Sequence, residues 1–348
     1  MTCRSIHGLL ALGGLFTGVP AALAQEQPAQ DRGDVVFVTA QKQEASVQDI
    51  AASVSALGSD ELEERGIASV DALQFAVPGL QSGTLYSAGG TAITIRGVGL
   101  NQGSPGVAVH VDGVYQATSF LASLAQADLE RVEILRGPQG TLYGRNANGG
   151  VVNFITKKPT SQFEAQLLAG YAEYDESHLQ TIVNAPIMDG VRSRVVLDYA
   201  NRSEGFTKNI LGGQDLESFE AVSGRGALSI DLSDSAVLDL TFAAIHQTGP
   251  LSAFQLNSLP NANAIAANPY LATASFTLKP HTTTANDPSE TELDYSLTTA
   301  TLTWDLGFAD LKSITSYASY NNDYTTDSDT TNISAFPQSN TAAATTTT

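Results

Sequence analysis

The sequence has almost no cysteine and few basic residues. Cys3 is the only cysteine of the 348 residues, and it precedes a segment that we expect to be cleaved off. The mature chain is therefore expected to have no disulfide bond and no cysteine-based metal site. Lysine and arginine number 17 against 36 aspartates and glutamates, which gives a formal net charge of −19. Because nucleic-acid binding needs clustered basic side chains, this acidic balance excludes a nucleic-acid partner.

Charged residues and long apolar runs are also scarce. Charged residues make up 15% of the chain, against roughly 25% in an average soluble domain. Threonine, serine, alanine, asparagine and glycine take their place, which suits short strands with uncharged polar faces. No apolar run reaches the ~18 residues that a membrane-spanning helix needs.

The motifs of common enzymes and metal sites are missing as well. The sequence has no G-x-S-x-G elbow and no G-x-x-x-x-G-K-[ST] phosphate loop. Of the five histidines, only His110 has an acidic neighbour two positions on, Asp112, and a polar strand position explains it better than a metal ligand does. We therefore predict a protein that is not an enzyme and that has no metal or cofactor.

The N-terminus has the features of a cleaved signal peptide. Arg4 is followed by an apolar stretch over residues 8–19, then by Pro20 and the small-residue cleavage pattern Ala22-Leu23-Ala24. The alternative, a membrane anchor, would need a longer stretch. We assign residues 1–24 to the signal peptide.

Residues 25–45 form a leader with one apolar segment. Its polar start is followed by the isolated apolar run Asp34, Val35, Val36, Phe37, Val38, Thr39 and Ala40. Such a run is either the first strand of the next domain or a docking strand that adds to the sheet edge of a partner. The pattern alone does not decide between the two.

Residues 46–158 are typical of a small α/β domain. Ser59 or Asp60 can cap a short helix that ends at Gly66, and Ser69 can cap a second helix that ends before Pro78. Four apolar segments then recur between glycines, TAITIRG, GVAVHVDG, LERVEILRG and GGVVNFIT. They predict a sheet of about four strands.

Residues 159–348 change to segments in which apolar and polar residues alternate. Such segments of about ten residues are typical of strands that cross a membrane as a barrel. In the third of them the polar face carries Arg192 and Arg194. We predict seven such strands, at about 163–171, 179–187, 191–199, 222–232, 236–244, 300–304 and 311–324.

The connections between these strands alternate in length. Three are short, at 188–190, 233–235 and 307–310, whereas the alternate connections at 203–217 and 247–291 are long and only the first of that set, near 175–177, is short. Membrane barrels have short turns on the periplasmic side and longer loops outside. The asymmetry favours a membrane barrel over a soluble sandwich.

Several motifs resemble those of TonB-dependent outer-membrane receptors. The match runs from Asp34 to at least Tyr324, and its most specific part is ERVEILRGPQGTLYGRNANGGVVNFITKKP. The residues that carry the plug motif are Gly97, Asp112, Gly113, Gly137, Pro138, Gly140, Tyr143, Gly144, Arg145, Asn146, Gly149 and Gly150. The segment from Asp34 to Ala40 resembles the TonB box of this family.

The resemblance implies a fold and a mechanism. An α+β plug would fill the lumen of an antiparallel transmembrane β-barrel of about 22 strands in the outer membrane of a Gram-negative cell. TonB, powered from the inner membrane, would pair with residues 34–40 and pull, so that the docking interpretation is preferred. The barrel would contact lipid, and a small-molecule ligand, by preference a ferric siderophore, would be taken up.

The resemblance also implies contacts between plug and barrel. Arg96, Arg136 and Glu133 match plug residues at this boundary, and the two arginines would pair with carboxylates on the inner wall of the barrel. An unpaired buried guanidinium is costly, so each needs such a partner if it is buried. The alternative is that both reach solvent at turns, as most arginines do.

The length of the sequence departs from that of the family. Seven strands cannot close a barrel, and open strand edges cannot lie in lipid. We therefore expect an incomplete barrel from a truncated or partial gene product that does not work alone. The alternative function is a secreted ligand-binding module with a soluble β domain.

Overall fold

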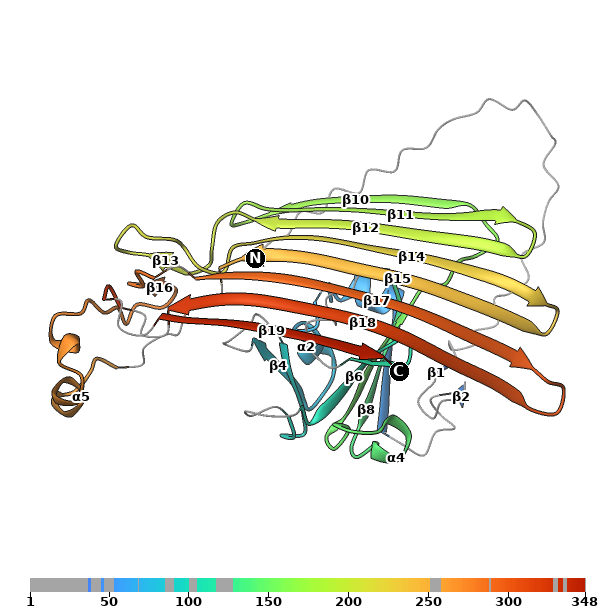
Figure 1. Ribbon diagram of the computed structural model, residues 1–348, viewed down its shortest axis with the longest axis horizontal. Helices are drawn as coiled ribbons and strands as arrows, with labels where there is room; N and C mark the ends of the chain where they lie inside the picture. The colour runs from blue at the N-terminus through green and yellow to red at the C-terminus, as the bar shows by residue number, and fades with distance from the viewer. Residues whose placement is uncertain are drawn as a thin grey trace, which may run out of the picture.

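The protein folds into a small mixed domain, the plug, that lies against one long antiparallel sheet, the wall. The computed structural model (Figure 1) describes residues 37–38, 45–46, 53–67, 69–84, 91–99, 105–116, 128–250, 258–287, 289–327, 331–333 and 337–347. The predicted signal peptide, together with Asp34, Val35, Val36, Thr39 and Ala40, lies outside these residues.

The leader contributes one short strand pair. Strand β1 (Phe37–Val38) pairs antiparallel with β2 (Ala45–Ser46). Two residues of the predicted docking segment thus already form part of a small hairpin.

The plug is built on a five-stranded sheet in the order β3-β8-β9-β6-β7. Only the β6–β9 pair is parallel. The strands are β3 (Ser53–Gly58), β6 (Val107–Val111), β7 (Val114–Gln116), β8 (Leu129–Arg136) and β9 (Gly150–Thr156). A separate pair joins β4 (Leu80–Thr84) to β5 (Thr91–Ile95).

This sheet corrects the prediction of about four strands. Three of the four predicted segments lie in it as β6, β8 and β9, whereas TAITIRG forms β5 outside it. Strands β3 and β7 join the sheet instead. Each has a glycine at one end only, and β7 has just three residues, so the pattern of segments between glycines did not reveal them.

The helices of the plug cover the apolar core of this sheet. They are α1 (Ser59–Glu64), α2 (Leu73–Ala76) and α4 (Gly140–Tyr143). The first two lie where helices were predicted, but their N-cap residues differ from the predicted ones. Gly58 rather than Ser59 or Asp60 precedes α1, and Ala72 rather than Ser69 precedes α2, although Ser69 Oγ accepts from the Ala72 N–H at 3.2 Å. Leu62 and Leu73 point from them into a core with Ile134 and Phe154 of the sheet. Burial of such side chains stabilises the domain by about 1.5–3 kcal/mol each.

The wall is one eight-stranded antiparallel sheet in which each strand pairs with the next along the chain. Among the described residues this sheet is open at both edges. Its strands are β10 (Glu164–Ala172), β11 (Glu176–Met188), β12 (Val191–Arg202), β14 (Phe219–Ser233), β15 (Ala236–Gly249), β17 (Glu290–Asp305), β18 (Asp310–Asp327) and β19 (Pro337–Thr347).

Seven of these strands confirm the predicted ones, and the eighth corrects the count. Strand β19 pairs with β18 from Tyr317 to Asp327, although its threonine- and alanine-rich sequence shows no apolar alternation. Threonine is β-branched and suits a strand. Strand β19 is held by its pairing with the edge of β18, and the local sequence cannot show such a pairing.

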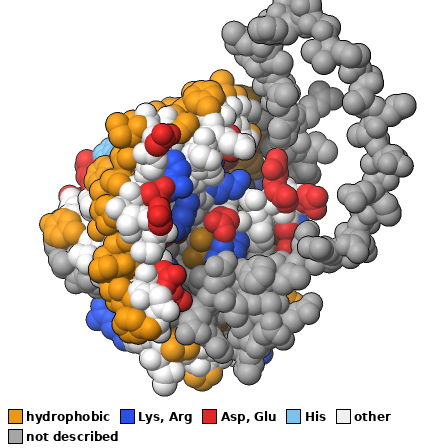
Figure 2. Space-filling model, turned by 90° about the vertical axis from the view of Figure 1, so that its right-hand side faces the viewer, with side chains coloured by type: hydrophobic (Ala, Val, Ile, Leu, Met, Phe, Trp, Pro, Cys, Tyr) orange, Lys and Arg blue, Asp and Glu red, His pale blue; other side chains and the backbone are white. Residues whose placement is uncertain are grey.

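The two faces of the wall differ in chemistry. The outward face exposes large apolar side chains, among them Leu167, Leu179, Leu197, Phe242 and Trp304. Polar and charged residues that alternate with them lie inward, against the plug. Figure 2 shows hydrophobic side chains along the outer margin and basic and acidic side chains gathered inside it. An apolar outer face over a polar inner face is the alternation expected of a wall in lipid.

The two ends of the wall differ in their connections. At the short-turn end, hairpins join β11 to β12, β14 to β15 and β17 to β18. The long-loop end carries the connections over 203–218 and 250–289, which meet where β13 (Lys208–Asn209) pairs with β16 (Thr282–Thr283). The second connection also holds α5 (Ala262–Ala267) and the 3-10 helix η3 (Pro269–Ala272). The predicted alternation is confirmed for these connections (Figure 1), whereas the one from β10 to β11, over 173–175 at the long-loop end, is short, as the sequence also predicted.

None of the helices in the described part of the chain is long and apolar enough to cross a membrane.

Candidate functional site

The plug is attached to the wall through one buried carboxylate, Asp128. It directly precedes β8 with a backbone φ of 68°, a left-handed conformation that aspartate tolerates better than most residues. Its side chain is only 1% exposed. A carboxylate buried this deeply needs cationic partners.

Two arginines of the wall supply that charge. Arg194 on β12 donates from Nε to Oδ2 and from Nη2 to Oδ1 of Asp128, both at 2.6 Å, which makes a two-pronged ion pair. Arg225 on β14 pairs with Oδ2 of the same carboxylate. Strands β12 and β14 are neighbours in which Val196 faces Arg225 and Arg194 faces Ala227, so both arginines point inward from adjacent strands.

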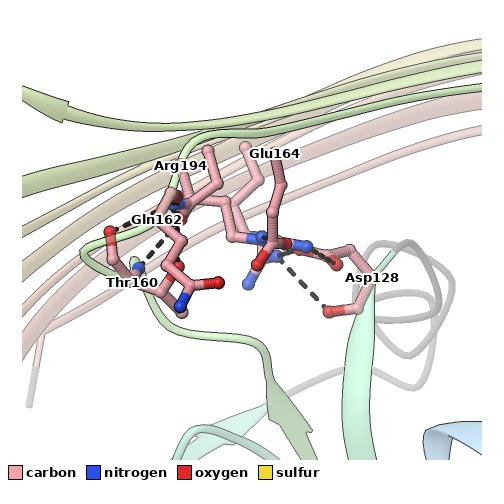
Figure 3. Close-up of polar contacts among 7 residues, drawn as sticks. Asp128, Thr160, Gln162, Glu164 and Arg194 are labelled. Carbon is pink, nitrogen blue, oxygen red and sulfur yellow. Dashed lines mark hydrogen bonds and ion pairs between the residues drawn. The ribbon is translucent and has the colours of Figure 1, made fainter. Parts of the chain in front are cut away.

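A second group of bonds holds the crossover from plug to wall. Asn184 of β11 is fully buried; its Oδ1 accepts from the Thr160 N–H at 2.9 Å, and its Nδ2 donates to the Thr160 carbonyl at 3.0 Å and to the Gln162 carbonyl at 2.5 Å. Close by, Arg194 Nη1 lies 3.5 Å from Glu164. Figure 3 shows these residues and Asp128 around the point where the chain enters the wall. The crossover is therefore fixed at the same place as the ion cluster.

The turn between β6 and β7 forms another contact with the wall. Asp112 in this turn has a φ of 49° and accepts hydrogen bonds from the N–H of Thr156 at 2.9 Å and from its hydroxyl at 2.8 Å. Burial raises the pKa of Asp112, and the Thr156 bonds and the charges of Arg225 and Lys158 only partly oppose this rise. Beside it, Gly113 lies so close to Ile314 of β18 that an added Cβ would stand 3.3 Å from its Cδ1.

Strand β7 extends this contact toward the long-loop end. Tyr295 of β17 donates its hydroxyl to Gln116 Oε1 at 3.0 Å, and both side chains are buried. Val114 packs there against Ile245 and Leu297. A cavity of about 30 Å³ separates plug from wall at this point, which is room for one or two water molecules. Among the lining atoms, Arg225 Nη1 has no hydrogen-bond partner within the described protein.

The interface between plug and wall thus combines one apolar cluster around Val114 with several buried polar contacts. It also includes the pair of Lys158 with Asp239 on β15 at 2.7 Å. Charged and hydrogen-bonding groups can exchange a protein partner for water, whereas an apolar contact loses its stabilisation in water. Chemically, this arrangement holds the plug in a defined position against the wall.

Two of the predicted boundary residues lie apart from this interface. Arg96 is exposed in the turn after β5, and Arg136 Nη1 donates to the Pro78 carbonyl at 3.5 Å. Neither forms an ion pair with a wall carboxylate within the residues that the structure describes. Their predicted role stays a prediction.

Glu133 lies inside the plug and not at its surface. Its side chain is fully buried on β8, where it accepts from Arg131 Nε at 2.8 Å and from Asn153 Nδ2 at 3.3 Å. Both partners belong to the plug sheet. A direct contact of Glu133 with the barrel therefore stays a prediction.

The glycines of the plug motif shape the backbone. Gly150 has a φ of 151°, and an added Cβ would stand 2.2 Å from the Leu135 carbonyl oxygen. A Cβ added at Gly149 would stand 2.9 Å from Val98. Only glycine allows β9 to approach β8 and the turn after β5 this closely. Positive φ values are also found at Gly97, Gly113, Gly137 and Gly144.

The remaining motif residues lie in the segment between β8 and β9, and two of them contact Tyr115 of β7. Asn146, with a φ of 66°, donates to the Tyr115 hydroxyl at 2.7 Å, and the Arg145 guanidinium lies over the Tyr115 ring. Tyr143 is buried in α4, and burial together with the charge of Glu133 raises its pKa to about 12. Pro138 and Gly140 flank the start of α4. These positions stabilise the plug and do not line the cavity.

Sequence reasoning missed the ion cluster itself. Arg194 is a basic residue on the polar face of a predicted strand. A guanidinium that faces the interior needs a carboxylate partner, so Arg194 could have indicated that such a partner exists elsewhere in the chain. Its partner Asp128 is 66 residues away along the chain and has no distinctive local pattern.

Comparisons with known proteins agree with this architecture. Residues 46–151 match the family model of the TonB-dependent receptor plug domain. The pesticin receptor of Yersinia pestis is 33% identical over 245 residues, which cover 68% of this chain and 35% of that protein. The iron-regulated outer membrane virulence protein of Vibrio cholerae is 32% identical over 227 residues, which cover 60% of this chain and 33% of that protein.

A solved structure shares the fold. The ferric yersiniabactin uptake receptor of Yersinia pestis aligns with a TM-score of 0.67 at 24% sequence identity. The alignment covers 80% of this chain and 42% of the receptor chain. The present chain spans about a third of the length of the curated relatives it matches.

The fold and the interface indicate the class of protein. A plug domain held against an antiparallel wall with an apolar outer face is the arrangement of plugged outer-membrane receptors. With the plug family model and these relatives, the chain belongs to the TonB-dependent outer-membrane receptors, and its location is the outer membrane.

Proposed function

We propose that this chain is the plug and first wall strands of a receptor for TonB-dependent uptake of a scarce nutrient across the outer membrane. The observation that carries the proposal is the polar interface around Asp128, Arg194 and Arg225. It holds a separable plug inside the wall, which a gated transporter needs and which a static binding module does not.

The domain organisation that we propose follows the sequence. Residues 1–24 are the signal peptide, 25–45 the periplasmic leader with the TonB box, 46–158 the plug and 159–348 the first part of the barrel. The short-turn end then faces the periplasm and the long-loop end faces outward, because outer-membrane barrels have long external loops. The exposed apolar face of the wall contacts lipid.

The proposed partner in the periplasm is TonB. Residues 34–40 are an apolar run in a polar leader, and β1 within it pairs, among the described residues, with β2 alone. Backbone groups on its other side suit the addition of a partner strand. A pull on this strand would act on β3, an edge strand of the plug sheet.

The proposed ligand class is a ferric siderophore. Support comes from relatives whose names refer to iron: the ferric yersiniabactin uptake receptor and the iron-regulated outer membrane virulence protein. The ligand would meet the long-loop end first, at the connections over 203–218 and 250–289.

Uptake in cells tests this proposal. The complete reading frame that contains these residues is expressed in a Gram-negative strain without its own siderophore receptors, and cell-associated radioactive iron is measured with a panel of ferric siderophores. We expect uptake of at least one chelate that stops when TonB is deleted. Uptake of none of them, or uptake that persists without TonB, would overturn the proposal.

A further inference from the structure

Three side chains with metal-ligating groups meet on the outward face of the wall, far from the interface with the plug. His246 lies on β15, and Glu292 and Asp294 lie on β17; their ligand atoms are all within 4.8 Å of one another. They face outward, because Ile245 and Tyr295, which alternate with them, are buried against the plug. We call His246, Glu292 and Asp294 the rim triad.

The pairing register of β15 and β17 fixes where the three residues of the rim triad lie relative to one another. His246 stands directly opposite Asp294 in the antiparallel ladder, and Glu292 is the diagonal neighbour, opposite Thr248. Directly opposed side chains have Cβ atoms about 4.5–5.5 Å apart, and diagonal ones about 7–8 Å, within reach of a glutamate. The backbone, and not only the side-chain rotamers, therefore brings the three groups together.

Further acidic side chains lie beside the rim triad. Glu220 on β14 and Asp323 on β18 lie on the same outward row, opposite Thr248 and Glu292 respectively. Over the described lengths of β14, β15 and β17 the sole basic residue is Arg225, which points inward to Asp128. Close carboxylates without a cation repel one another. A bound divalent cation would remove this repulsion, since it becomes the largest local charge.

The donor set selects the kind of cation. One imidazole nitrogen with two carboxylate oxygens suits zinc and similar divalent transition ions, whereas calcium and magnesium prefer oxygen alone. His246 Nδ1 and Asp294 Oδ1 lie 2.8 Å apart, a hydrogen-bond distance. Two ligands of one tetrahedral zinc ion at bonds of about 2.0–2.2 Å stand about 3.3–3.6 Å apart, so the two side chains would separate by less than about 1 Å to admit the ion. Both side chains are about half exposed, so an ion can reach them.

We infer that the rim triad binds a divalent transition cation of the zinc class. Three protein ligands leave at least one coordination position for water. The cation joins the end of β15 to the start of β17, the two strands from which the long connection over 250–289 leaves and to which it returns. Its binding therefore stabilises the base of this connection.

Zinc titration of the folded full chain in detergent tests the inference. By calorimetry with zinc chloride, we expect one saturable site per wild-type chain. The variants His246→Ala and Glu292→Gln should each weaken it at least about tenfold, because each loses a ligand. Limited proteolysis within 250–289 should slow on zinc addition in the wild type and not in Glu292→Gln. Circular dichroism melting in the absence of metal confirms that each variant is folded.

The chain offers a matched control. His178 Nε2 and Asp198 Oδ2 form another cross-strand histidine–aspartate pair, at 2.7 Å between β11 and β12. His178→Ala should bind zinc as the wild type does. The inference is wrong if the wild type shows no saturable site, if His246→Ala and Glu292→Gln bind as tightly as the wild type, or if His178→Ala loses as much affinity as His246→Ala.

Discussion

Asp128 of the plug and Arg194 of the wall form a two-pronged ion pair, with both nitrogen–oxygen distances at 2.6 Å and both side chains at most 5% exposed. A buried pair of this kind contributes little net stability compared with apolar packing, but the loss of one partner leaves an uncompensated charge. The ion pair therefore positions the plug, because it specifies where the start of β8 docks on β12 and β14.

Replacement of Asp128 is expected to destabilise the docked plug. Asp128→Asn keeps the shape of the side chain but leaves Arg194 and Arg225 without their shared anion, at a cost of about 3–5 kcal/mol. The measurement is the urea midpoint of tryptophan fluorescence from Trp304 in the wall, together with trypsin sensitivity of the plug.

The control for Asp128 is Glu164. It is 53% exposed and lies 3.5 Å from Arg194, so Glu164→Gln should change stability by no more than about 1 kcal/mol. Equal effects of the two substitutions would contradict the importance of the buried pair.

Gly150 should not tolerate a side chain. Gly150→Ala would place a Cβ 2.2 Å from the Leu135 carbonyl at a φ of 151°, so that β8 and β9 must move apart; backbone strain alone costs about 1–3 kcal/mol. Thermal unfolding measures the loss. Gly58→Ala is the matched control, because Gly58 has open space around it and a φ of −73°. A wild-type melting temperature for Gly150→Ala would refute the prediction.

The raised pKa of Asp112 predicts a pH dependence of stability. Burial holds its pKa above the ordinary value of 3.8, so between 3.8 and the raised value the folded state binds more protons than the unfolded state. The contribution of Asp112 therefore decreases as the pH rises through this window.

The variant Asp112→Asn, which cannot titrate, isolates this contribution. Its stability relative to the wild type should increase as the pH rises from about 4 to 7, measured as the difference in urea midpoints. A difference that is constant over this range would show that the carboxyl has an ordinary pKa in the folded protein.

The docking strand can be tested without disturbing the rest of the receptor. Val38→Pro removes a backbone N–H from β1 and should abolish TonB-dependent uptake of iron by the complete reading frame, while ligand binding to whole cells is retained. Val38→Thr keeps the N–H and the β-branched shape, and should retain most of the uptake. Uptake that survives the proline would exclude residues 34–40 as the TonB contact.

Much of the fold follows from local patterns. Alternating segments such as 179–187 and 191–199 predict β11 and β12 because a strand with lipid on one side and a polar lumen on the other must alternate. The pattern fails where alternation is absent: the threonine-rich β19 pairs only because β18 offers a free edge. In the plug, β7 has only three residues, and β3 is not bounded by glycines on both sides as the predicted strands were.

The sequence by itself therefore determined the class of protein, the order of plug and wall, the faces of the strands and the glycine turns, because each depends on residues close together along the chain. Only the tertiary structure decided which charges meet. Asp128 has no local signature, and its pairing with Arg194 and Arg225 depends on how the start of β8 docks against β12 and β14. The rim triad likewise exists only through the register of β15 and β17, which brings residues 246 and 294 face to face. Hydrogen-bonded register and docking are long-range properties, and no periodicity within one strand contains them.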